Sequence, residues 1–195
     1  MTYVVLREIK NCTEEQKRAV REVRNQLSVR KLMYTEHEIA LDEHFGWIER
    51  LKDDKRQIVF VVFVDNAVSG VVSVNAIDRL HKKSDWAFYL AENARGGLGA
   101  ALEYTLLEFV FNKLDLAKLN CEVIETNPAV IKLHKKFSFV EEGFRRENIE
   151  KEGKRLGVYF LGLTKSDWMQ SKSEILEKYR STLNKFDISI EYATP

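Results

Sequence analysis

The sequence predicts an α/β fold in which one central sheet carries helices on both faces. The length of 195 residues lies within the range of a single domain. Apolar runs of strand length alternate along the chain with amphipathic stretches of helical period. The strand-like runs at 58–64 and 70–77 are continuously apolar rather than alternating, which is typical of strands that are covered on both faces.

The first third of the chain begins with a predicted strand at residues 3–9 and a helix at residues 13–27. Thr13 and Gln16 have the spacing of a capping box, in which each side chain bonds the other residue's free backbone N–H. Residues 24–39 have no clean period and are predicted to form an ordered loop.

The remaining elements follow in mixed order. The β-branched and aromatic run IVFVVFV ends at a turn, Asp65-Asn66, and GVVSVNAI is its partner strand. The predicted strands after the first occupy residues 58–64, 70–77, 86–90, 118–124, from 139 onward, and 156–163. The predicted helices after the first occupy residues 42–51, 98–110, 128–137 and about 166–183.

No shift in composition marks a boundary inside the first part of the chain. We therefore predict one domain at residues 1–164, followed by a C-terminal helical extension at residues 165–195. The extension is read as a charged helix and a tail. Its apolar residues, among them Ile175 and Tyr179, could dock it on the domain or on a second copy in a homodimer.

Composition excludes several classes of protein. Thirty-one Lys and Arg residues balance 30 Asp and Glu residues, so the net charge of +1 provides no general field for nucleic acid. Cys12 and Cys121 make neither a disulfide framework nor a zinc site, and no metal is expected. The start lacks the apolar core of a signal peptide, and no apolar run is long enough to span a bilayer. A cytoplasmic protein without a membrane partner is expected.

A glycine-rich turn, Arg95-Gly96-Gly97-Leu98-Gly99-Ala100, lies between the strand at 86–90 and the longest central helix. Glycine lets the backbone approach a ligand closely, and the N–H groups at a helix N-terminus attract an anion such as a diphosphate. The same turn could also serve only close packing of the helix on the sheet. Its position in mid-chain and the lack of a following Gly-Lys-Ser/Thr argue against dinucleotide-binding and P-loop folds.

A second pattern follows the strand at 118–124 and reads Asn127-x-x-Val130-x-x-Leu133-His134-x-Lys136-Phe137-Ser138-Phe139. Together with the glycine turn, it resembles the GNAT superfamily of N-acetyltransferases over residues 3–163. That family has a Gln/Arg-x-x-Gly-x-Gly/Ala turn and a later Asn-x-x-Ala-x-x-Leu-Tyr-x-Lys-x-Gly-Phe motif. Here Ala94 occupies the Gln/Arg position, with Arg95 beside it, and His134 stands where Tyr is frequent.

The resemblance implies a mixed, mostly antiparallel sheet, with acetyl-CoA as co-substrate and without a metal. It implies that the end of the strand at 86–90 pairs with pantetheine and that the N–H of Leu90 acts as an oxyanion donor. The residues expected to bind the cofactor are Phe88, Tyr89, Leu90, Arg95, Gly96, Gly97, Leu98, Gly99, Ala100, Asn127 and Lys136.

Residues 24–39, with the sequence RNQLSVRKLMYTEHEI, and the His and Trp that follow resemble the N-acetyltransferases of pseudaminic acid biosynthesis. These enzymes acetylate the 4-amino group of a UDP-linked 4-amino-4,6-dideoxy sugar, so the resemblance implies a nucleotide-sugar acceptor. Arg side chains can bind its phosphates bidentately, and apolar side chains can pack on the deoxy-sugar. The residues expected to bind the acceptor are Arg24, Arg30, Met33, Tyr34, His44, Trp47 and Trp86.

Acetyl transfer to an amine needs a proton for the leaving thiolate and a neutral amine. His134 is the predicted general acid, because the pKa of imidazole, about 6.5, lies near that of a thiol, about 8.5. A surface His on a basic helical turn is the alternative. Ser73 matches the position that the family offers for receiving the amine proton. Asp85, Glu92 and Glu125 are alternative bases.

Three classes of function remain compatible with the sequence. The first is the nucleotide-sugar N-acetyltransferase. The second is an acetyltransferase that acts on a protein N-terminus or on another small amine. The third is a non-catalytic module that binds acetyl-CoA.

Overall fold

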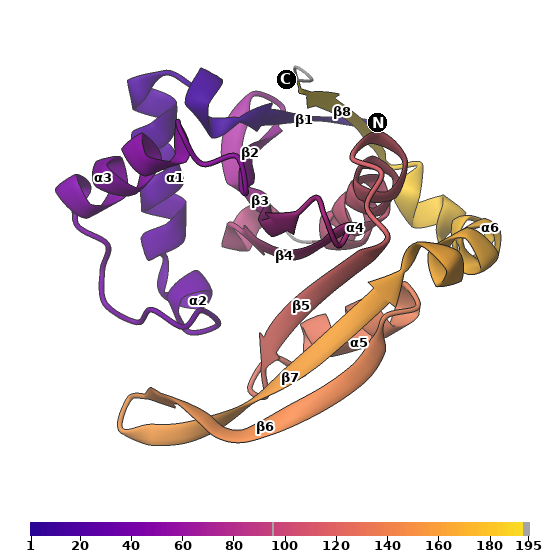
Figure 1. Cartoon of the computed structure of the whole chain (residues 1–195). Helices are drawn as coiled ribbons and strands as arrows, with labels where there is room; N and C mark the ends of the chain where they lie inside the picture. The colour runs from indigo at the N-terminus through magenta and orange to yellow at the C-terminus, as the bar shows by residue number, and fades with distance from the viewer. Residues whose placement is uncertain (95, 193–195) are drawn as a thin grey trace.

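In the computed structural model, which describes residues 1–94 and 96–192, eight strands form one mixed sheet in the order β6-β7-β5-β4-β3-β2-β1-β8 (Figure 1). The pairs β1–β8 and β4–β5 are parallel, and the other pairs are antiparallel. The strands are β1 (Thr2–Glu8), β2 (Ile58–Val64), β3 (Ala67–Asp78), β4 (Lys83–Leu90), β5 (Lys118–Ile124), β6 (Val140–Lys151), β7 (Lys154–Thr164) and β8 (Phe186–Glu191).

The helices connect these strands in the predicted order. They are α1 (Glu14–Asn25), α2 (Leu27–Arg30), α3 (Leu41–Leu51), α4 (Leu98–Glu108), α5 (Pro128–Lys136) and α6 (Lys165–Leu183). Shorter turns are η1 (Ile9–Asn11), η2 (Glu92–Ala94) and η3 (Phe109–Lys113), the last a π-helical continuation of α4. The capping box at the start of α1 is confirmed, since Thr13 Oγ1 accepts from Gln16 N at 3.2 Å and Gln16 Oε1 accepts from Thr13 N at 3.0 Å.

Two segments differ from the expectation. The predicted loop at residues 24–39 contains the short helix α2. The predicted tail contains β8, which pairs with β1 in parallel. Phe186, Ile188 and Ile190 of β8 pack against the core, but this alternation covers only six residues, too few to stand out from the polar sequence around it. The boundary at residue 164 stays a prediction, although β8 belongs to the same sheet as the strands before that boundary.

Helices cover both faces of the sheet, as the continuous apolar runs predicted. In β2, Phe60 and Val62 belong to the cluster that includes α4, α5 and α6. Val59, Val61 and Phe63 of the same strand pack with residues of α1 and α3. Because neighbouring residues of a strand point to opposite faces, this strand is buried on both sides.

The sheet opens into a fork between β4 and β5. The two strands pair only from Lys83 with Lys118 to Asp85 with Asn120, although β4 continues to Leu90. At the fork, Asn120 Nδ2 donates to Asp85 Oδ1 at 3.2 Å. Beyond it, β5 and β7 diverge from β4, and the hairpin of β6 and β7 reaches toward α2 (Figure 1). The parts of β4 and β5 beyond Asp85 and Asn120 are therefore not paired with each other.

Within the part of the chain that the structure describes, no helix has the length and apolar character needed to cross a bilayer.

Candidate active site

The fork holds a cavity of about 590 Å³, which we name the cofactor cavity. The end of β4, the start of α4 and α5 contribute to its lining. The predicted cofactor residues that line it are Phe88, Tyr89, Leu90, Gly96, Gly97, Gly99, Ala100, Asn127 and Lys136. Leu98 is 1% exposed and belongs to the core instead. Arg95 lies outside the described residues.

The glycine turn has a backbone that disfavours side chains. Gly96 and Gly97 have φ of 100° and 101°, and Gly97 is the N-cap of α4 in the left-handed region. A Cβ added at Gly97 would lie 2.8 Å from Thr182 Cγ2, whereas one added at Gly96 would meet nothing within 4 Å. The two glycines that precede the 11-residue helix α4 line the cavity, and there is free space beside Gly96.

Two further features shape the cofactor cavity. Asn127 Oδ1 accepts from Val130 N at 3.4 Å and so caps α5 where the helix meets the cavity. Tyr179 and Thr182 of α6 also line it. The sequence singled out neither as a site residue, because nothing in the helical pattern of α6 shows that its last turns lie against the glycine turn.

A second cavity of about 400 Å³ continues the first, and we name it the acceptor cavity. Leu32, Met33, Phe88, Asn127 and Val130 line both, so the two cavities share a wall. The predicted site residues in the acceptor cavity include Arg24, Met33, Tyr34, Trp86 and His134.

His134 is buried rather than exposed on a basic turn. Its ring is 3% exposed and packs against Trp86, Phe88 and Phe139, with centroid separations of 5.1, 6.3 and 5.2 Å. Nδ1 lies 2.9 Å from Oε1 of Glu103, a fully buried residue of α4. The sequence did not single out Glu103, because its partner is 31 positions away and on another helix.

Burial raises the pKa of the Glu103 carboxyl, while the neighbouring His134 acts in the opposite direction. Trp86 is also buried and stacks on Phe88 at 5.3 Å. Cys121 lines the acceptor cavity, but burial raises the pKa of its thiol, as expected of an unreactive cysteine.

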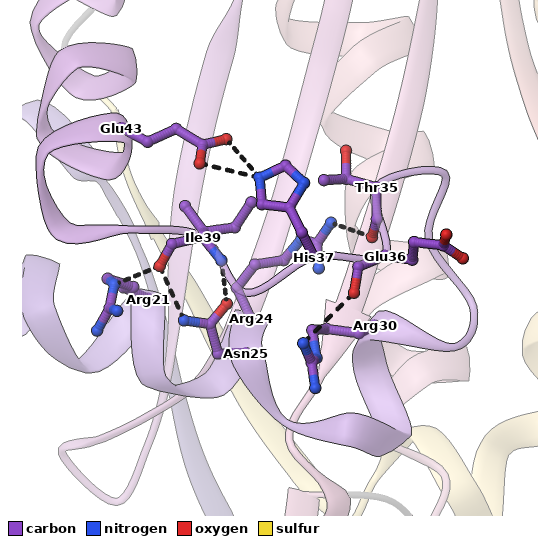
Figure 2. A network of polar contacts seen from close by, with 9 residues as sticks. All are labelled: Arg21, Arg24, Asn25, Arg30, Thr35, Glu36, His37, Ile39 and Glu43. Carbon is purple, nitrogen blue, oxygen red and sulfur yellow. Dashed lines mark hydrogen bonds and ion pairs between the residues drawn. The ribbon is translucent and has the colours of Figure 1, made fainter. Parts of the chain in front are cut away.

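The irregular segment after α2 is held in place by hydrogen bonds to α1 and α2 (Figure 2). Asn25 and Ile39 exchange two of them, since Asn25 Nδ2 donates to Ile39 O at 3.0 Å and Ile39 N donates to Asn25 Oδ1 at 2.9 Å. Arg21 Nε donates to the same carbonyl at 2.6 Å. The loop is ordered by these side chains, as its composition predicted.

Arg24 and Arg30 take different positions in this network (Figure 2). Arg24 Nη2 donates to Thr35 O at 3.4 Å, while its buried Nη1 has no hydrogen-bond partner among the described residues. Burial lowers the pKa of Arg24, and its side chain lines the acceptor cavity. Arg30 Nη1 donates to Glu36 O at 3.3 Å, and Arg30 is absent from the described linings of the cavities in the fork.

The hairpin of β6 and β7 bridges the open end of the fork. Lys151 Nζ donates to the carbonyls of Arg30 at 2.8 Å and Met33 at 2.5 Å, and Glu152 N donates to Glu36 Oε2 at 2.9 Å. Burial lowers the pKa of Lys151. The hairpin thus fixes the segment that carries Met33 to the opposite half of the sheet.

Tyr34 lies on the acceptor side of that bridge. Its hydroxyl donates to Glu122 Oε2 of β5 at 2.5 Å. Burial, followed by this hydrogen bond, raises the pKa of the phenol.

His44, Trp47 and Ser73 line a third, inner cavity of about 320 Å³, which shares Arg24 and Met33 with the acceptor cavity. His44 Nε2 donates to Lys17 O at 2.8 Å, which ties α3 to α1. Ser73 Oγ donates to Ala87 O at 3.3 Å and accepts from Asn75 Nδ2 at 2.9 Å. Ser73 therefore bonds within the sheet and does not line the acceptor cavity as the structure describes it.

The described residues contain no group of three or more His, Cys, Asp and Glu side chains placed to hold a metal ion.

Known proteins resemble this chain in sequence and in fold. The profile of the acetyltransferase (GNAT) domain family matches residues 9–156. Acetyltransferase PseH of Campylobacter jejuni is 25% identical over 134 residues, which cover 67% of this chain and 83% of that protein. Spermidine N(1)-acetyltransferase of Escherichia coli is 25% identical over 130 residues, which cover 66% of this chain and 70% of that protein.

The crystal structure of spermidine N-acetyltransferase from Vibrio cholerae in complex with CoA and spermine superimposes with a TM-score of 0.78 at 22% identity. The superposition covers 85% of this chain and 98% of that one. At this identity it establishes the fold, and the predicted mixed, mostly antiparallel sheet with helices on both faces is confirmed.

Proposed function

Since the chain belongs to the acetyltransferase (GNAT) family, whose members use acetyl-CoA, we propose that it acetylates the 4-amino group of a UDP-linked 4-amino-4,6-dideoxy sugar. One observation carries the proposal. Arg24, Met33 and Tyr34 of the segment that resembles the pseudaminic-acid enzymes line a cavity that shares a wall with the cofactor cavity. An acceptor held by these residues meets the thioester at that wall.

On the cofactor side, the N–H groups at the start of α4 are proposed to bind the pyrophosphate of acetyl-CoA. The helix dipole contributes about 0.3–1 kcal/mol for a favourable charge near its N-terminus. Asn127 and Lys136 line the same cavity and offer polar contacts to the nucleotide or to pantetheine. The end of β4 supplies the pantetheine edge, with Leu90 N as the proposed oxyanion donor.

On the acceptor side, Arg24 is the proposed phosphate ligand. Its buried Nη1 has no hydrogen-bond partner within the described part of the chain, and a guanidinium binds phosphate oxygens through parallel N–H bonds. Met33 and Trp86 offer apolar surface to the sugar methyl group. Burying one methyl contributes about 0.8 kcal/mol, so this wall orients the sugar more than it holds it.

In the proposed step, the amine nitrogen forms a bond to the thioester carbon while the C–S bond breaks. The sulfur takes a proton from His134, and the amine proton leaves to solvent, either directly or through water near Ser73. The buried position of His134 beside Phe88, which lines both cavities, supports the acid role. Ser73 is the weaker assignment, because its hydroxyl already donates to Ala87 O.

A polyamine acceptor is the second candidate. Asp85 and Glu122 line the acceptor cavity and suit a cationic amine. However, Asp85 accepts from Asn120 and Glu122 accepts from Tyr34, so both carboxylates already have partners.

A free-thiol assay with acetyl-CoA tests the proposal. The acceptors are UDP-4-amino-4,6-dideoxy sugars that differ at one stereocentre, spermidine, and a peptide with a free N-terminus. We expect thiol release with one sugar stereoisomer, and we expect UDP alone to raise the melting temperature. Release with spermidine only would replace the sugar by a polyamine. Binding of acetyl-CoA without release from any acceptor would indicate a non-catalytic module.

Cytoplasmic location and a homodimer stay predictions. Cell fractionation and light scattering test them directly.

A further inference from the structure

We infer that Glu103 is a positioning residue that keeps the transferable proton on His134, an inference that rests on the acid role proposed above. Glu103 lies on α4 and His134 on α5, so the contact joins the two helices whose starts line the cofactor cavity. Their side chains meet at 2.9 Å between Oε1 and Nδ1.

Packing alone does not account for a carboxyl group at this position. Glu103 is fully buried on a helix whose neighbouring inward residues, Leu102, Leu106 and Leu107, are apolar. Its second oxygen, Oε2, has no hydrogen-bond partner among the described residues. A leucine would fill such a place without the cost of desolvating a carboxyl group. Among the described residues, His134 is the one whose side chain hydrogen-bonds to Glu103.

The surroundings of the pair are largely apolar. Trp86, Phe88 and Phe139 pack around the His134 ring. The ring lines the acceptor cavity, and its neighbour Phe88 lines both the acceptor cavity and the cofactor cavity. In such apolar surroundings the pair is most stable when its net charge is zero.

Net neutrality fixes where the protons are. The neutral pair holds two protons. One lies in the hydrogen bond between Nδ1 and Oε1, whether it formally belongs to the ring or to the carboxyl group, and the other is on Nε2. Losing the Nε2 proton would leave a buried negative charge, so Glu103 makes the pair retain this proton to higher pH. Without Glu103, a doubly protonated ring would be an unpaired buried cation, so the ring would keep a single proton, and a neutral imidazole is too weak an acid to give that proton to the thiolate.

The test variant removes the charge of Glu103 and keeps the shape of its side chain. Glu103→Gln retains a group that can bond Nδ1. The matched control is Glu108→Gln on the same helix, where the carboxylate of Glu108 accepts from Trp168 Nε1 instead of pairing with His134. Circular dichroism and thermal melting confirm that each variant is folded.

The first readout needs no acceptor. In protein labelled with ¹⁵N-histidine, a His134→Asn spectrum assigns the His134 ring nitrogens. We expect the His134 ring to lose its second proton at a pH about 1–3 units lower in Glu103→Gln, the usual effect of removing an opposite charge, and at an unchanged pH in Glu108→Gln. An identical titration in wild type and Glu103→Gln would overturn the inference.

The second readout is the pH profile of kcat with acetyl-CoA and the UDP-amino sugar. We expect the fall of kcat at high pH to shift down by the same interval in Glu103→Gln, with KM for acetyl-CoA unchanged. In His134→Tyr, whose phenol needs no carboxylate, adding Glu103→Gln should leave the profile in place. A profile that does not move while the ring titration does would also overturn the inference.

The two failures are distinguishable. Absence of wild-type turnover with the sugar refutes the proposed function, and the ring titration still decides whether Glu103 controls the proton on His134.

Discussion

The cofactor side and the acceptor side of the fork differ in the groups that are available to bind a ligand. The cofactor side includes three segments whose backbone is proposed to bind the ligand, namely the glycine turn, the start of α4 and the end of β4. The acceptor side consists of side chains from an irregular segment, and contacts such as those of Lys151 and Glu122 hold it from the other half of the sheet.

The difference has a functional consequence. Amide groups at a helix N-terminus bind any suitable phosphate and depend little on which side chains surround them. Side chains on an irregular segment can change identity without disturbing the sheet, so the acceptor can differ between proteins that share this fold. Substitutions on the two sides should therefore affect different kinetic constants.

The largest effect is expected where the two sides meet. His134→Ala should lower kcat by about 10²–10⁴-fold, the usual contribution of a general acid, with little change in either KM. Steady-state kinetics with the sugar acceptor measure it. An unchanged kcat would remove His134 from the mechanism.

A substitution in the glycine turn should weaken binding of the cofactor alone. Gly97→Ala forces a side chain into a left-handed conformation, at a cost of about 1–2 kcal/mol, and brings its Cβ to 2.8 Å from Thr182 Cγ2. We expect KM for acetyl-CoA to rise about 5–30-fold while KM for the acceptor stays constant.

Gly96→Ala is the matched control, because its φ is similar and its Cβ would meet nothing within 4 Å. The difference between the two variants isolates the contact with α6. An equal rise in both acceptor and cofactor KM would contradict the separation of the two sides.

A substitution in the β6–β7 hairpin, which bridges the fork, should weaken binding of the acceptor alone. Lys151→Met removes the two hydrogen bonds to Arg30 O and Met33 O. Since one such bond to a charged group contributes about 1.5–3 kcal/mol, KM for the acceptor should rise on the order of tenfold or more. Lys154→Met, an exposed change in the same hairpin, is the control. A rise in KM for acetyl-CoA instead would show that the bridge supports the whole fork.

The smallest effect concerns stability. Burial lowers the pKa of His44, so the unfolded chain takes up this proton at a higher pH than the folded chain does. The melting temperature should therefore fall as pH drops below about 6.5, the ordinary pKa of His, and His44→Gln should reduce that slope. The exposed His37→Gln serves as control. An unchanged slope in His44→Gln would mean that another group causes the dependence.

Some site residues could be identified from the sequence because local physics places them. A glycine with positive φ before a helix, and an Asn that caps the next one, act within a few residues of themselves. The strands at 58–64 and 118–124 agree with β2 and β5 to the residue, since the pattern of apolar residues within each strand is local too.

Other residues required distant partners. The basic run around His134 is equally compatible with an exposed helix, and only the packing of α5 on α4 places its ring against Glu103. Arg30 resembles a phosphate ligand in sequence, but its guanidinium bonds the carbonyl of Glu36.

The sequence by itself determined the order of the strands and helices other than α2 and β8, the glycine turn and the acetyltransferase family, because each depends on periodicity, on backbone freedom or on motifs a few residues long. The tertiary structure decided how β4 and β5 separate, which side chains face the fork and which carboxyl group accompanies His134. These depend on contacts between residues far apart in the chain, and such contacts leave no periodic trace in it.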